Sequence, residues 1–185
     1  MRFQIAEFRF QIGRCRLPLA LAAAVLVLAG ASLRAETIDR VMAVVAGQII
    51  TLSDVTVARD LGLVAAAPSP DPIRAVLSQL IDRELMLAEV DRYAPPEPSA
   101  DAIDRDLAAV RARFSSTADY EAVLTRSGID DSHVREFVRL TLRIRAYQDQ
   151  RFSSTDSRRE ALIEEWLSAL RRRGDVVDIY AAGRR

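Results

Sequence analysis

The chain has no lysine, a single cysteine and a single histidine, and these shortages exclude several classes of chemistry. Cys15 and His133 are too few for a zinc ligand set. A nucleophile–histidine–acid triad needs more context than the sequence offers, and His133, in the first turn of a predicted helix, is expected to be a solvated surface residue. The seven glycines are scattered and form no phosphate-binding loop. We therefore expect no metal site, no cofactor and no catalytic residue.

Neither sign of charge dominates the chain, because 26 arginines balance 26 acidic residues. Arg139, Arg143 and Arg145 are interleaved with apolar residues, which is typical of a solvated helix face rather than a nucleic-acid-binding patch. Residues 1–35 hold five arginines and one glutamate, so their removal leaves 21 basic and 25 acidic residues and a net charge of −4. A mildly acidic domain of this kind predicts no nucleic-acid partner.

An uncharged apolar stretch at residues 17–33 follows four arginines near the start of the chain. Small residues at 29–31 fit the A-x-A cleavage pattern, and residues 33–35 are a weaker alternative. This arrangement predicts a secretory signal peptide over residues 1–35, and therefore an exported protein that meets the membrane only during export. The alternative is an uncleaved membrane anchor, although about 20 apolar residues are usual for spanning a bilayer.

Two runs rich in β-branched residues, 41–45 and 49–52, flank Ala46-Gly47 and predict a β-hairpin. A lone hairpin is only marginally stable in water, so a further strand is expected to pair with it. Near the other end of the chain, the segment DVVDIY at residues 175–180 is bracketed by glycines and favours a strand. We expect this strand to join the hairpin in a three-stranded sheet.

The remainder of the chain is predicted to be helical, with a capping signal before each helix. These signals are Thr51-Leu52-Ser53-Asp54, Asp71-Pro72, Ser99, Ser116-Thr117-Ala118-Asp119, Asp130 or Asp131, and Ser157-Arg158-Arg159-Glu160. One long helix is expected over about 72–93, and Gly128 and Gly174 are expected to end two others. Arg171–Arg173 suit the negative C-terminal end of the last helix. The predicted fold class is mostly α, a helical body with a small sheet.

The amphipathic helices carry a surplus of apolar surface, most of which is expected in the core. Part of it can instead line a groove for apolar peptide segments. Met42, Met86, Phe114 and Tyr147 are of the adaptable or aromatic kinds that such grooves favour. The sequence does not separate these four residues from the core, so it assigns no peptide-binding residue.

The order of these motifs resembles the SurA family of periplasmic chaperones. The resemblance runs through IDRVMAVVAGQIITLSDV, VLSQLIDRELMLAEV, DYEAVLTRSGIDDSHVREFVRLTLRIR and EEWLSALRRRGDVVDIY, with Trp166 in place. It covers residues 36–180 and implies a SurA N-terminal-like chaperone core. In that core, the C-terminal helix and strand of residues 157–180 fold back onto the preceding helices, and residues 181–185 form a tail.

The chain departs from the family between its last two long helices. Family members commonly carry one or two parvulin-type prolyl isomerase domains there, of roughly 90 residues each, whereas this chain has only RFSSTDSRR. The resemblance without this domain therefore implies no enzymatic activity. It implies a periplasmic chaperone that works without ATP and binds apolar or aromatic segments of unfolded exported polypeptides, outer-membrane proteins above all. The alternatives are an isomerase-related protein by family name only, or a non-catalytic interaction subunit for one folded partner.

Overall fold

The computed structural model describes residues 39–65, 67–152 and 158–182. The chain divides into residues 1–38 and 39–185, and the described residues all belong to the second unit. The predicted signal peptide, residues 1–35, and the last three residues of the predicted tail lie outside the described ranges. Within those ranges, no helix is both long enough and apolar enough to cross a membrane.

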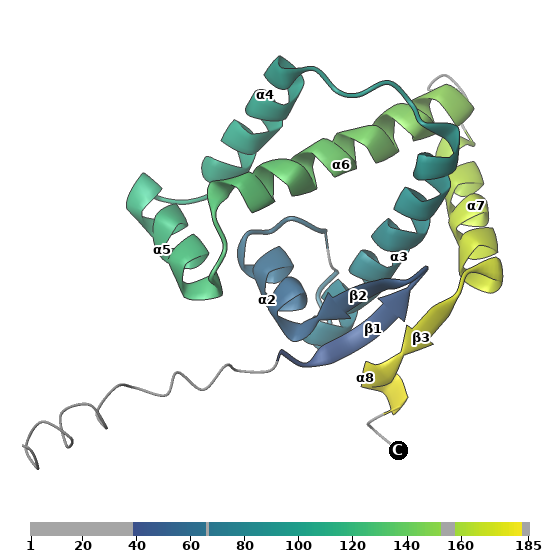
Figure 1. The fold of residues 1–185 in the computed structure, drawn as a ribbon, viewed down its shortest axis with the longest axis horizontal. Coiled ribbons are helices and arrows are strands. Elements are labelled where there is room, and N and C mark those ends of the chain that lie inside the picture. Colours follow the sequence, from purple (N-terminus) through teal and green to yellow (C-terminus); the bar gives the residue numbers. More distant parts are fainter. Residues whose placement is uncertain (1–38, 66, 153–157, 183–185) are drawn as a thin grey trace, which may run out of the picture. The chain divides into compact units, whose positions relative to one another are not determined.

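The described residues are mostly helical, with one small antiparallel sheet (Figure 1). The strands are β1 (Val41–Val45), β2 (Gln48–Thr51) and β3 (Val176–Asp178). The helices are α2 (Leu52–Asp60), α3 (Pro72–Tyr93), α4 (Ala100–Arg111), α5 (Thr117–Ser127), α6 (Asp131–Arg151), α7 (Arg159–Arg173) and the short α8 (Ile179–Ala182). The predicted mostly helical fold class is confirmed at this level.

The sheet joins the two ends of the described chain in the order β2-β1-β3. Val44 in the central strand lies opposite Ile49 on one side and Val177 on the other. Ala46 and Gly47 both have positive φ, 49° and 82°, as a two-residue hairpin turn requires. The predicted hairpin and its third strand are therefore confirmed.

The C-terminal strand is shorter than the predicted 175–180. It ends at Asp178, and Ile179 and Tyr180 belong to α8. The Tyr180 hydroxyl donates a hydrogen bond to the carboxylate of Asp71, the N-cap of α3, at 3.0 Å. Because this partner lies 109 residues away, the local β-propensity of the segment did not indicate the change in direction.

The predicted caps explain where most helices begin. Thr51 and Asp54 form a reciprocal capping box at the start of α2. Asp71, Ser99 and Ser116 each accept a backbone N–H from the first turn of the next helix. Of the two candidates before α6, the N-cap is Asp130. Helix α7 begins at Arg159 with Arg158 at its N-cap, so the predicted capping box does not mark where it begins. Ser157, the first residue of that predicted box, lies outside the described residues.

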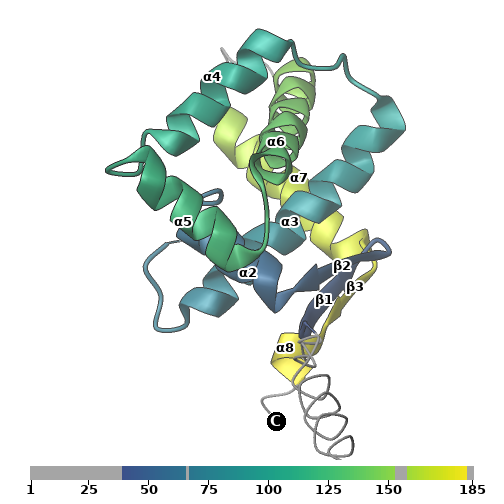
Figure 2. The same cartoon turned by 60° about the vertical axis from the view of Figure 1, so that its left-hand side comes forward.

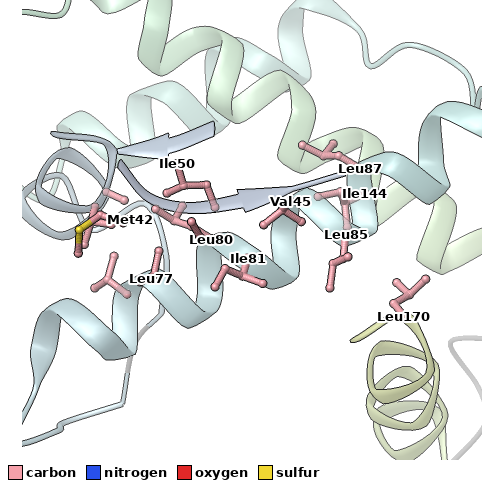
Figure 3. Packing of buried hydrophobic residues seen from close by; sticks show 14 of the residues in the cluster. Met42, Val45, Ile50, Leu77, Leu80, Ile81, Leu85, Leu87, Ile144 and Leu170 are labelled. Carbon is pink, nitrogen blue, oxygen red and sulfur yellow. The ribbon is translucent and has the colours of Figure 1, made fainter. Parts of the chain in front are cut away.

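The larger apolar core lies between the sheet and α3, and α6 and α7 complete it (Figure 3). Val45 and Ile50 from the hairpin meet Leu80 and Ile81 from α3. A second cluster joins the end of α2 to α4, α5 and the first half of α6, and it contains Leu61, Ile103, Leu107, Val110, Tyr120, Leu124, Val134 and Val138. In Figure 2, α4 and α5 lie on one side of α6 and α3 lies on the other.

Charged contacts attach the last long helix to α3. Asp82 and Glu89 are buried acidic residues of α3, with exposed fractions of 3% and 7%. Both carboxylate oxygens of Asp82 accept hydrogen bonds from Arg171, and Glu89 lies 3.0 Å from the guanidinium of Arg173. Two of the three arginines expected to complement the end of α7 therefore also neutralise buried acids in another helix.

Candidate functional site

A groove of about 320 Å³ opens beside strand β2, and it is the leading candidate for a functional site. Its walls come from β2, α2, α3, the end of α5 and the start of α6. The volume is at the lower end of the range for ligand-binding pockets, roughly 300–1,000 Å³. It suits a few side chains of a peptide rather than a large cofactor.

Apolar side chains form most of the lining. Val57 and Ala58 come from α2, Leu80 from α3, and Val134 and Phe137 from α6. The two residues of α6 are three positions apart, so they lie on the same face of the helix. Ala58, Leu80 and Val134 also belong to the core, which means that the groove is backed by rigidly packed helices.

Arg83 in α3 is the one basic residue of the lining apart from His133. Its guanidinium stacks over the ring of Phe137 at 4.0 Å and donates a hydrogen bond to Glu84 at 2.9 Å. Arg83 is 8% exposed, and its Nε has no hydrogen-bond partner in the described part of the chain. Burial lowers the pKa of Arg83, and the neighbouring Glu84 opposes that effect. The Arg83–Phe137 contact therefore joins α3 to α6 beneath the groove.

Two carboxylates accompany this arginine. Burial raises the pKa of Glu84, Arg83 opposes the rise, and the negative charge of Asp54 adds to it. Asp54 accepts hydrogen bonds from the backbone N–H and hydroxyl of Thr51 but forms no ion pair among the described residues. Since Arg83 is paired with Glu84, the charge of Asp54 remains uncompensated and the groove is slightly acidic.

The open edge of the sheet borders the same groove. Strand β2 is an edge strand, and Gln48, Ile49 and Ile50 contribute to the lining. Val45 and Gln48 face each other across the two-residue turn and form the first hydrogen-bonded pair. In an antiparallel ladder, hydrogen-bonded pairs alternate with pairs that are not bonded to each other, so the next pair, Val44 and Ile49, is not hydrogen-bonded. The backbone N–H and C=O of Ile49 therefore point away from β1, toward the open edge of the sheet. Ile49 is 60% exposed.

His133 lies at the rim of the groove, although no functional role was expected for it from the sequence. Its side chain is 63% exposed, and Nδ1 lies 2.8 Å from a carboxylate oxygen of Asp130. Hydrogen bonds from Ser132 and His133 lower the pKa of Asp130 to about 2. This arrangement is the capping box of α6, and it agrees with the expectation of an exposed histidine at a helix start.

None of the four apolar groove candidates from the sequence lines this groove. Met42 and Tyr147 are core residues, with exposed fractions of 0% and 4%. Met86 packs against the larger core, and Phe114 packs against the smaller one with its ring 5.4 Å from that of Tyr120. The four residues lie in or against the core instead, and the lining of the groove beside β2 comes from segments distant in sequence.

One sequence feature indicated indirectly that the charged residues of the groove would be buried. Arg83 and Glu84 occur where α3 is apolar on more than one side, which predicts burial on several faces. A charged residue within such a helix is expected to have a partner. The described residues contain no group of three histidine, cysteine or acidic side chains placed to hold a metal ion.

No family model matches the chain, and no curated protein sequence matches it at a significant level. Function is therefore inferred from the geometry and chemistry of the groove.

Proposed function

We propose that this protein is an ATP-independent periplasmic chaperone, a SurA-type helical core without the parvulin domain. Its clients are unfolded or partly folded exported polypeptides, outer-membrane proteins above all, and it contacts their apolar and aromatic segments. The arrangement of hairpin, helices and returning C-terminal strand supports the proposal, because it is the arrangement that the resemblance implies.

The apolar groove beside β2 carries the proposal. Its lining presents packed aliphatic and aromatic groups together with backbone polar groups at an open strand edge. Such a surface binds many sequences, since apolar contacts are non-directional and backbone groups are common to all peptides. Ordering a flexible client offsets much of the contact energy, so we expect micromolar affinity, about −8 kcal/mol. Release then needs no nucleotide.

A light-scattering assay with an unfolded β-barrel protein tests this function. The protein lacking residues 1–35 should suppress aggregation at near-stoichiometric ratios. Ser127→Trp places a large side chain at the groove wall and should weaken suppression. Ser168→Trp places the same side chain on the exposed face of α7 and should leave suppression unchanged.

Unchanged aggregation at a several-fold molar excess of the wild-type protein would contradict the proposal. A single saturable complex with one folded protein, without suppression of aggregation, would favour an interaction subunit instead. Catalysed cis–trans exchange in a proline peptide, abolished by one groove substitution, would favour an isomerase. The proposed export is tested by mass spectrometry of the periplasmic fraction, which should show a new N-terminus near Ser32 or Glu36.

A further inference from the structure

The groove and the open edge of the sheet form one continuous surface. Ile49 belongs to both, because it lies in the edge strand and lines the groove. Its N–H and C=O point outward, whereas the N–H of Thr51 is already bonded to Asp54. The edge therefore offers one free donor and one free acceptor from the same residue. These are the groups that a single residue of an incoming antiparallel strand bonds.

The geometry of an added strand also suits the groove. Successive side chains of a strand point to opposite faces. A residue opposite Ile49 shares the solvent-exposed face of the sheet, and its two neighbours point to the face on which Ile50 is buried. Apolar neighbours would then contact the apolar lining formed by α2, α3 and α6.

The charge of the lining selects among apolar segments. Asp54 has no cationic partner among the described residues, and Glu84 lies close enough for Asp54 to raise its pKa. A basic residue in a bound segment would pair with Asp54, whereas an acidic residue would be repelled by both carboxylates. The groove is therefore expected to bind an extended, apolar segment that carries a basic residue.

We propose that such a segment binds as a fourth strand on the outer edge of β2, bonded to the backbone of Ile49, with its basic side chain at Asp54. This proposal rests on the chaperone function above and specifies how the same groove selects its clients. It predicts that the protein distinguishes unfolded segments by their charge and by their ability to form a strand.

Synthetic peptides test both parts of the proposal on the protein lacking residues 1–35. The probe is an acetylated and amidated nonapeptide in which valine alternates with threonine and arginine occupies one central position. One matched peptide has glutamate at that position, and another has alternate backbone nitrogens methylated. Fluorescence anisotropy of labelled peptides should show affinity about three- to ten-fold weaker for each matched peptide, as expected for one or two lost interactions. Equal affinity for plain and methylated peptides would overturn strand addition.

Two variants of Ile49 separate its backbone from its side chain. Ile49→Pro removes the outward N–H, and proline is tolerated at such edge positions. Ile49→Thr keeps the N–H while reducing the apolar side chain. The proline variant should bind the arginine probe several-fold more weakly than the threonine variant, and equal binding would overturn the proposal. If the proline variant does not fold, the methylated peptide still decides the question on wild-type protein.

Asp54→Asn tests the charge preference, because asparagine retains an oxygen that can cap α2. This variant should lose most of its preference for the arginine probe over the glutamate probe, because the remaining carboxylate, Glu84, is already paired with Arg83. Asp119→Asn is the matched control, since Asp119 has the same position in the first turn of α5 but does not line the groove. An unchanged preference for arginine in Asp54→Asn would overturn the assignment of Asp54.

Three further outcomes separate this proposal from the chaperone function and from self-association. Equal suppression of aggregation by wild-type protein and Ile49→Pro would overturn strand addition and leave the chaperone function standing. A failure of the wild-type protein to suppress aggregation would remove the chaperone function itself. A dimer in analytical ultracentrifugation that Ile49→Pro dissociates and Ile49→Thr does not would show that a second copy occupies the edge, and would overturn the peptide assignment.

Discussion

Gly174, where α7 ends, shows why a single residue type is required at one position. Its φ of −75° is open to any residue, so backbone strain does not explain the glycine. A Cβ atom there would lie 2.4 Å from Leu85 Cδ2 and 2.8 Å from the carbonyl oxygen of Leu170. Leu85 and Leu170 belong to the larger core at the contact of α3 with α7 (Figure 3). Glycine is therefore required by close packing.

The Gly174→Ala variant should be destabilised by about 1–3 kcal/mol, the usual cost of inserting a methyl group into a packed site. The carbonyl of Leu170 is part of the backbone, so it cannot move as a flexible side chain would. Urea unfolding would show a lower midpoint with an unchanged slope. Ser168→Ala, at an exposed position of α7, is the control. Equal midpoints for the two variants would contradict the close-packing explanation.

Asp130 predicts a pH dependence from a single exposed carboxylate. Its folded pKa of about 2 lies below the ordinary 3.8, so its contribution to stability is present above pH 4 and is lost as pH falls through 2. Wild-type protein should therefore melt at a higher temperature than Asp130→Asn at pH 5. The difference should shrink as pH is lowered toward 2. A difference that stays constant over this range would show that the carboxylate charge is not the source.

At the scale of elements, the attachment of α7 to α3 depends on buried acids. Asp82 in α3 is nearly inaccessible, and Arg171 in α7 binds both of its carboxylate oxygens. Hydrogen bonding to Asp82 raises the pKa of Arg171, so the guanidinium remains charged. The interaction therefore joins two helices through residues that are 89 positions apart in the chain.

Arg171→Ala should destabilise the protein by about 1–3 kcal/mol, because Asp82 would remain buried without its partner. Arg171 itself is half exposed, so the loss should not reach the cost of breaking a fully buried pair. Arg172→Ala is the matched control, since Arg172 is exposed and forms no ion pair among the described residues. Chemical denaturation should show a loss for the first variant only. Equal losses would indicate a general effect of charge at the end of α7.

At the scale of the whole described unit, the fold is closed by its last residues. Strand β3 pairs with β1, and Tyr180 is bonded to the N-cap of α3. Arg74 in α3 also forms an ion pair with Asp178. The C-terminal segment therefore contacts both the sheet and the helix that backs it.

Deletion of residues 175–185 should lower the melting temperature of the whole unit. The deletion removes a strand, exposes the second edge of β1 and leaves a two-stranded hairpin, which is marginally stable alone. Circular dichroism would follow the loss. The matched control removes residues 183–185 only, which lie outside the described ranges. An unchanged melting temperature in the longer truncation would contradict the role of β3 in closing the fold.

The sequence alone determined the features that depend on neighbours within a few residues. The hairpin turn at Ala46-Gly47 and the caps at Thr51, Asp71 and Asp130 all use contacts over two to four positions. Local hydrogen bonds and backbone preferences can be predicted from a few consecutive residues. The mostly helical class and the return of the C-terminal strand followed from these features and from the instability of a lone hairpin.

Only the tertiary structure decided which apolar and charged residues meet. It placed Met42 and Tyr147 in the core, ended β3 before Ile179, and brought Ile49 and Arg83 to one groove. Amphipathic patterns indicate that a face is covered but do not name the segment that covers it. The groove exists because five segments distant in sequence fill their shared space incompletely, and that depends on side-chain packing across the whole core.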